Sequence, residues 1–127
     1  MAKSRINVAV IGGGKTGTPF IKQLLDAEFV DVQGVADLDL NAPGMQLAKE
    51  HGVFVTSDYM ELVRKGMLID VLIEVTGVDE VRENIVSYLQ ETGNNHTVLM
   101  REIIAILMMS LAEGKLVETY HGYQKYA

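Results

Sequence analysis

The chain has 127 residues, a formal net charge of −6 and no cysteine, with 48% apolar and 22% charged residues. This length predicts one domain with a real core but too little chain for a two-domain enzyme. The negative charge argues against a nucleic-acid or anionic-membrane surface, and the lack of cysteine excludes disulfides, thiolate catalysis and cysteine-ligated metals.

No secretory signal is visible, because the first five residues are polar and the apolar run after them is short. The longest apolar stretch, 103–109, falls far below the roughly 20 residues that cross a bilayer. We therefore expect a cytoplasmic protein with no membrane partner.

Strand and helix patterns alternate along the chain. Ile6–Ile11 is typical of a buried strand, and a helix is expected over 18–27, where Phe20, Ile21 and Leu24 share one face. The elements expected next are a strand over 29–36, a helix over 42–51, a strand over 53–56, a helix over 59–65, a strand over 69–75, a helix over 79–92, a strand over 97–100 and a helix over 101–113.

Single residues predict several helix ends. Asn41 is expected to cap the second helix and Gly52 to end it, while Asp58 and Gly66 do the same for the third. The fourth helix is expected to turn inward the side chains of Val81, Ile85, Val86 and Leu89.

This alternation forces parallel strands joined by right-handed crossovers, with helices on both faces. We predict a single α/β domain over 1–127, with a doubly wound, mostly parallel, Rossmann-like sheet. In such a sheet, ligands bind beyond the carboxyl ends of the strands, near the switch between the first and fourth strands. Three features face that crevice: the turn over 12–17, Asp37, and the loop Thr76-Gly77-Val78.

The turn over 12–17 reads G-G-G-K-T-G, and Asp37 follows it by about 20 residues at the end of the second strand. The region 6–37 therefore has the parts of a dinucleotide-binding βαβ unit. Gly12 permits the tight turn, Gly14 lets the backbone approach a pyrophosphate, and Gly17 lets the helix lie close to the sheet. The free N–H groups of that helix attract phosphates. A purely structural glycine turn is the alternative.

Asp37 stands where a carboxylate can accept hydrogen bonds from both hydroxyls of an adenosine ribose and would repel a 2′-phosphate. The next residues are Leu38, Asp39 and Leu40, with no arginine, so NAD is favoured over NADP. The alternative is an exposed acid in a turn, which we expect of Asp39.

Two features of the fourth strand, over 69–75, concern ligands or partners. Thr76-Gly77 ends it and could touch the ribose or nicotinamide side of a dinucleotide, although a strand exit that requires glycine is an equal alternative. Glu74 lies inside it, and because a buried acid needs partners, a sheet edge or an oligomer contact is expected there.

Other site types fit the sequence less well. Gly14-Lys15-Thr16 resembles the end of a P-loop, but the first glycine of that motif would fall at Ala9. A methyltransferase-type loop would need an acid before the glycines and a glycine at position 16. The histidines have no metal-ligand spacing, so no metal is expected; they are His51, His96 and His121. The tail tyrosines Tyr120, Tyr123 and Tyr126 are expected to pack or line a contact.

The last helix, over 101–113, has almost no polar face, since it carries Ile103, Ile104, Ile106, Leu107, Met108, Met109 and Leu111. We expect it to be buried nearly all round. One sheet face covers only one side of a helix, so we predict a homodimer in which a second subunit covers the rest; neighbours within the chain are the alternative.

Three segments resemble a known family: V-A-V-I-G-G-G-K-T-G over 8–17, V-A-D-L-D over 35–39, and I-D-V-L-I-E-V-T-G over 69–77. With them, the chain over 6–89 resembles the NAD-binding domains of Gfo/Idh/MocA oxidoreductases and of homoserine and aspartate dehydrogenases. The resemblance implies a pyrophosphate on the glycines, a ribose on Asp37 and the nicotinamide side at Thr76-Gly77. The candidate cofactor-binding residues are Gly12, Gly13, Gly14, Lys15, Thr16, Gly17, Asp37, Leu38, Thr76 and Gly77.

Those enzymes continue with a lysine-bearing motif and a substrate domain, whereas this chain continues with Met100-Arg101-Glu102. Hydride transfer needs a second reactant and usually a proton donor, and neither is recognisable. The main hypothesis is a stand-alone NAD(H)-binding domain that senses or presents the cofactor. The alternatives are a small NAD-dependent dehydrogenase whose substrate site a partner subunit completes, with Lys15, Tyr120 or His121 as acid, and a non-catalytic interaction module.

Overall fold

The structure is a computed structural model that describes residues 5–14 and 17–117. Its centre is a sheet of five parallel strands in the order β3-β2-β1-β4-β5. The strands are β1 (Ile6–Ile11), β2 (Val30–Ala36), β3 (Val55–Thr56), β4 (Val71–Glu74) and β5 (Val98–Arg101). The helices are α1 (Gly17–Asp26), α2 (Pro43–Glu50), α3 (Met60–Val63), α4 (Asp79–Glu91) and α5 (Glu102–Glu113), with a 3₁₀ turn, η1 (Gly66–Leu68). The predicted doubly wound α/β fold is confirmed.

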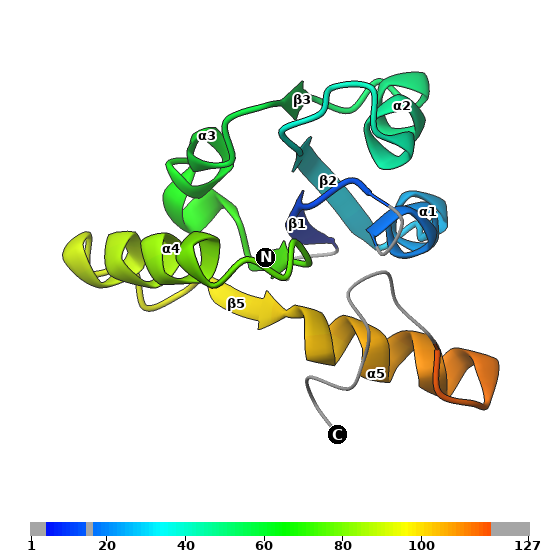
Figure 1. Cartoon of the computed structure of the whole chain (residues 1–127). Helices are drawn as coiled ribbons and strands as arrows, with labels where there is room; N and C mark the ends of the chain where they lie inside the picture. Colours follow the sequence, from blue (N-terminus) through cyan, green and yellow to red (C-terminus); the bar gives the residue numbers. More distant parts are fainter. Residues whose placement is uncertain (1–4, 15–16, 118–127) are drawn as a thin grey trace.

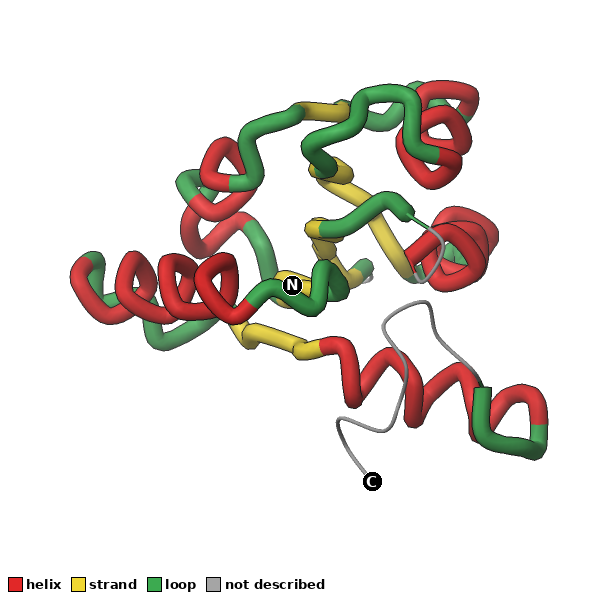
Figure 2. The backbone as a smooth tube through the Cα atoms, viewed as in Figure 1, coloured by secondary structure: helices red, strands yellow, loops and turns green. Residues whose placement is uncertain are grey.

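Helices cover both faces of the sheet (Figures 1 and 2). Alternate residues of β1 point to opposite faces: Val8 and Val10 join the core cluster formed with α1, α2 and α5, whereas Ala9 and Ile11 join the cluster formed with α3 and α4. Two buried faces explain why the strands are almost continuously apolar, as parallel strands usually are.

Some predicted details are wrong at helix ends and faces. The last helix begins at Glu102 rather than at 101, because Arg101 still pairs with Glu74 in the β4–β5 ladder. Ala42 occupies the N-cap position of α2, and the side-chain oxygen of Asn41 accepts instead from the side-chain amide of Gln46 at 3.3 Å.

The ends and inner faces of α3 and α4 are also partly corrected. The carboxylate of Asp58 accepts from the backbone N–H of Met60 at 3.0 Å, but Tyr59 rather than Asp58 occupies the N-cap position of α3, which ends at Val63 and is shorter than expected. On α4, Ile85 is fully buried as predicted, but Val86 is exposed on the neighbouring face.

Helix α5 packs one stripe of residues on the sheet and leaves another open. Ala105, Ile106 and Met109 are buried. The outer stripe is exposed by 42–73% and consists of Ile104, Leu107, Met108 and Leu111. Within the single chain, the sheet therefore covers only one side of α5, as expected. Within the described part of the chain, no helix is long and apolar enough to cross a membrane.

Candidate functional site

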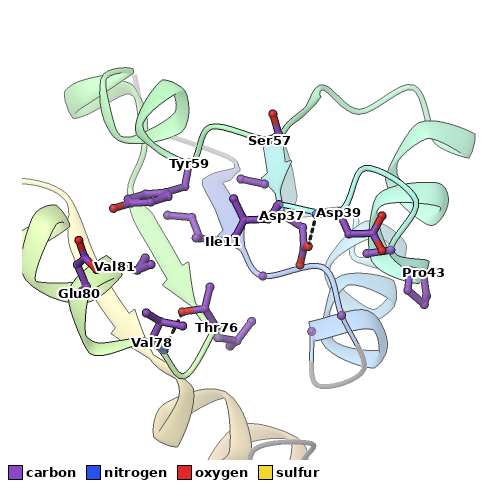
Figure 3. A pocket seen from close by; sticks show the side chains of 17 residues that line it. Ile11, Asp37, Asp39, Pro43, Ser57, Tyr59, Thr76, Val78, Glu80 and Val81 are labelled. Carbon is purple, nitrogen blue, oxygen red and sulfur yellow. Dashed lines mark hydrogen bonds between the residues drawn. The ribbon is translucent and has the colours of Figure 1, made fainter.

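A cavity of about 730 Å³ opens at the carboxyl ends of β1, β2 and β4, where the strand order switches (Figure 3). Its walls come from the turn after β1 and from the loops after β2, β3 and β4. The lining residues are Ile11, Gly12, Gly14, Gly17, Ala36, Asp37, Leu38, Asp39, Ala42, Pro43, Ser57, Tyr59, Val75, Thr76, Val78, Glu80 and Val81.

The glycine turn between β1 and α1 has the geometry that its spacing predicts. Gly12 has φ +114° and donates its N–H to the carbonyl of Ala36 at 2.7 Å. A Cβ at Gly17 would lie 2.2 Å from the carbonyl oxygen of Gly12, so only glycine allows α1 to start this close to β1. A Cβ at Gly14 would meet nothing within 4 Å, and Gly14 lines the cavity.

Helix α1 is anchored at the cavity rim. The backbone N–H of Thr18 donates to the carbonyl of Gly14 at 3.0 Å, and the Thr18 hydroxyl donates to the same carbonyl at 2.7 Å. The N–H groups of a first helical turn have no partner within the helix, and they carry the positive end of its dipole. The candidate residues Lys15 and Thr16 lie outside the described residues.

The Asp37 carboxylate is held between the glycine turn and the loop after β2. One oxygen accepts from the N–H of Gly13 at 2.8 Å, and the other accepts from the N–H of Asp39 at 2.8 Å. Each carboxylate oxygen has a further lone pair, so Asp37 can also accept from hydroxyl groups of a ligand. Its neighbour Leu38 lines the same cavity and is 90% exposed.

At the end of β4, Glu74 turns its carboxylate back onto the loop. One of its oxygens accepts from both the N–H and the hydroxyl of Thr76, each at 2.6 Å. Since β4 lies between β1 and β5, the expectation of a sheet edge at Glu74 is wrong, and the buried acid finds partners two residues away. Thr76 lines the cavity, whereas Gly77, with φ +72°, and Gly13 lie beside lining residues rather than among them.

Several wall residues were not predicted from the sequence, including Ser57 and Tyr59 after β3 and Glu80 and Val81 at the start of α4, whereas Val78 lies in the predicted loop. The Tyr59 hydroxyl accepts a hydrogen bond from the Asn84 side-chain amide at 2.9 Å, which joins the loop after β3 to helix α4. Only their position in the sequence could have indicated these residues, because residues that closely follow a strand of a doubly wound sheet lie at its ligand-binding edge.

The described lining side chains include three acids, Asp37, Asp39 and Glu80, and no lysine, arginine or histidine. In this part of the site, an anionic group therefore meets no cationic side chain, and the groups that can bind it are backbone N–H groups, the helix dipole and the hydroxyls of Ser57 and Tyr59. A phosphate near Asp37 and Asp39 is disfavoured, since like charges repel. Among the described residues, no group of three His, Asp or Glu side chains could hold a metal ion.

The fold and this cavity define a Rossmann-type α/β domain with a ligand crevice at the topological switch. No family model matches the chain. Among curated proteins, an acetaldehyde dehydrogenase of Desulfitobacterium hafniense (strain DSM 10664 / DCB-2) is 30% identical over 77 residues, which are 60% of this chain and 26% of that protein.

Solved structures give the same picture. GenD2 from gentamicin A biosynthesis, in complex with NAD, is 27% identical with a TM-score of 0.58, covering 76% of this chain and 26% of GenD2. Homoserine dehydrogenase of S. aureus is 17% identical with a TM-score of 0.55, covering 87% of this chain and 30% of that chain, and supports the fold alone. The resemblance to dehydrogenase NAD-binding domains is confirmed, over about a quarter to a third of each relative.

Proposed function

We propose that this chain binds NAD(H) in the cavity at the carboxyl ends of β1, β2 and β4. The observation that carries the proposal is the Asp37 carboxylate, tied to the N–H of Gly13 at 2.8 Å beside a turn whose Gly14 leaves open space. The cavity volume of about 730 Å³ is within the range of small-molecule and cofactor sites. The 27% identity to GenD2, solved with NAD, gives independent support.

In this proposal the pyrophosphate lies over Gly12, Gly13 and Gly14 and at the start of α1, and the further candidate residues for it are Lys15, Thr16 and Gly17. Asp37 accepts hydrogen bonds from the adenosine ribose, Leu38 contacts the adenosine, and Thr76-Gly77 lies toward the nicotinamide. NAD is preferred to NADP, because Asp37 and Asp39 would repel a 2′-phosphate.

The physiological role that we propose is a cofactor-binding or sensing module made of the whole chain as one domain, working in the cytoplasm. The support is that the described lining includes the Asp37 carboxylate, which can accept hydrogen bonds from a ribose, and the glycine turn, whose backbone can approach a phosphate. The second candidate is a small NAD-dependent dehydrogenase whose substrate site a partner subunit completes, and the likeness to dehydrogenases favours it.

Calorimetric titration of the chain with NAD, NADH, NADP, ATP and coenzyme A tests the proposal. We expect NAD or NADH to be the tightest ligand, because only these combine a free adenosine ribose for Asp37 with a pyrophosphate and a second ribose. Failure to bind any adenine nucleotide would overturn the proposal and leave the non-catalytic interaction module. Turnover of NADH with simple oxo acids or semialdehydes would favour the dehydrogenase instead.

We also propose that the outer stripe of α5 is a homodimer contact. Its members, Ile104, Leu107, Met108 and Leu111, follow the i, i+3, i+4, i+7 spacing of a continuous apolar stripe. Burying such side chains stabilises by roughly 1.5–3 kcal/mol each, so a second copy packed on this stripe would gain several kcal/mol.

Replacing Leu107 with glutamate in the middle of this stripe is expected to convert a dimer into a monomer, because each subunit would then bury a charge in the contact. Sedimentation equilibrium at micromolar concentration measures the mass. Met67→Glu is the matched control, since Met67 is also an exposed apolar residue but lies in η1, before the amino end of β4. A monomeric unmodified chain, or equal effects of both substitutions, contradicts this interface.

A further inference from the structure

The hydroxyl of Thr76 has its single proton committed to Glu74. It donates to a Glu74 carboxylate oxygen at 2.6 Å, and that same oxygen accepts from the backbone N–H of Thr76. The Thr76 hydroxyl in turn accepts from the N–H of Val78 at 3.0 Å. A hydroxyl has one proton and two lone pairs, so one lone pair is left for a ligand.

Toward the cavity, Thr76 can therefore only accept a hydrogen bond. A phosphate oxygen is itself an acceptor and does not fit this position. A ligand hydroxyl or an amide N–H does, because either can donate. Thr76 and Val78 both line the cavity, and Figure 3 shows them at the same wall.

Glu74 fixes where this acceptor stands. The residue is 4% exposed, and its backbone lies between Ile11 of β1 and Arg101 of β5 in the sheet. The end of β4 also packs directly on the glycine turn, since a Cβ at Gly12 would lie 3.2 Å from the Thr76 nitrogen. The position of Thr76 is thus set relative to the turn that would hold the pyrophosphate.

The strand order decides which part of a dinucleotide reaches Thr76. Asp37 follows β2 and Thr76 follows β4, and β1 with its glycine turn lies between them. The two riboses of a dinucleotide flank its pyrophosphate in the same way. With one ribose on Asp37 and the pyrophosphate on the turn, the second ribose falls on the Thr76 side, and its hydroxyls are donors.

We infer that Glu74 is a positioning residue that presents the Thr76 hydroxyl as a hydrogen-bond acceptor for the second ribose of the bound dinucleotide. This inference rests on the proposed function. It gives a role in binding to Glu74, which does not line the cavity, and it requires that the ligand present a hydrogen-bond donor to Thr76.

The test compares the dissociation constants of ADP, which has only the first ribose, and ADP-ribose, which also has the second. Thr76→Val is expected to raise the dissociation constant of ADP-ribose about threefold to tenfold, because one hydrogen bond is lost. The dissociation constant of ADP should change by no more than about twofold. Glu74→Ala is expected to give the same selective loss. Glu74→Gln should restore most of the selectivity, because one amide oxygen can accept both bonds from Thr76.

The double variant Glu74→Ala/Thr76→Val should lose no more selectivity than Thr76→Val alone, because both substitutions remove one interaction. A purely structural role of Glu74 would weaken both ligands equally and would overturn the inference, as would additive losses in the double variant. If Glu74→Ala does not fold, unchanged selectivity in Thr76→Val is sufficient to overturn it. An unmodified chain that binds neither ligand refutes the proposed function itself, and the inference falls with it.

Discussion

Replacing Gly17 with alanine is expected to lower the free energy of unfolding by about 2–3 kcal/mol, the cost of forcing an atom into a filled space. The new Cβ would lie 2.2 Å from the carbonyl oxygen of Gly12 and 3.3 Å from a methyl carbon of Val75. The Gly12 backbone cannot move aside freely, since its N–H is bonded to the Ala36 carbonyl at 2.7 Å. Urea denaturation followed by circular dichroism measures the change.

Gly14→Ala is the matched control in the same turn. A Cβ there would meet nothing within 4 Å, so the free energy of unfolding should change by less than about 0.5 kcal/mol. Because Gly14 lines the cavity, the same substitution should weaken NAD binding, since the added methyl group narrows the space in which a ligand approaches the backbone. Equal losses of stability in the two variants would contradict this account of the turn.

The fold, and the meeting of the glycine turn and Asp37 at one cavity, were predictable from the sequence because both depend on short-range patterns. The apolar run of Ile6–Ile11, the spacing of Gly12, Gly14 and Gly17, and the position of Asp37 after the second strand are each readable within one βαβ unit. Close packing then follows locally, since the contact between Gly17 and Gly12 lies within one turn of chain.

Details that depend on how distant segments meet were not predictable in the same way. Tyr59 reaches the cavity and bonds Asn84, 25 residues further along the chain, only because α3 and α4 cover the same sheet face. Glu74 was expected to need a partner from a sheet edge or another subunit, yet its carboxylate accepts from Thr76 through a side-chain conformation that no residue pattern specifies. Composition predicted the apolar character of α5 but not which of its residues face outward.

Replacing Asp37 with alanine is expected to weaken NAD binding by about 1–3 kcal/mol, because a charged hydrogen-bond acceptor for the ribose is lost. The dissociation constant should then rise roughly fivefold to 150-fold. The affinity for NADP should fall less, or rise, since the repulsion of its 2′-phosphate by Asp37 disappears at the same time. The ratio of the two affinities is the informative quantity. Loss of the bond from Gly13 to Asp37 loosens the turn for both ligands alike and cancels in that ratio.

Asp39→Ala separates a specific contact from a general charge effect. It removes the same charge from the same cavity, but the Asp39 carboxylate accepts from the N–H of Asn41 at 2.9 Å and has no bond to the glycine turn. Calorimetric titration of both variants with NAD and NADP, at two salt concentrations, should show a much larger change of ratio for Asp37→Ala. Charge repulsion alone would shift the ratio alike in both variants and would fade with salt, whereas a hydrogen bond to the ribose persists. Equal and salt-sensitive shifts of the affinity ratio would therefore contradict a hydrogen bond between Asp37 and the ribose. They would show that the two acids act only through their negative charge.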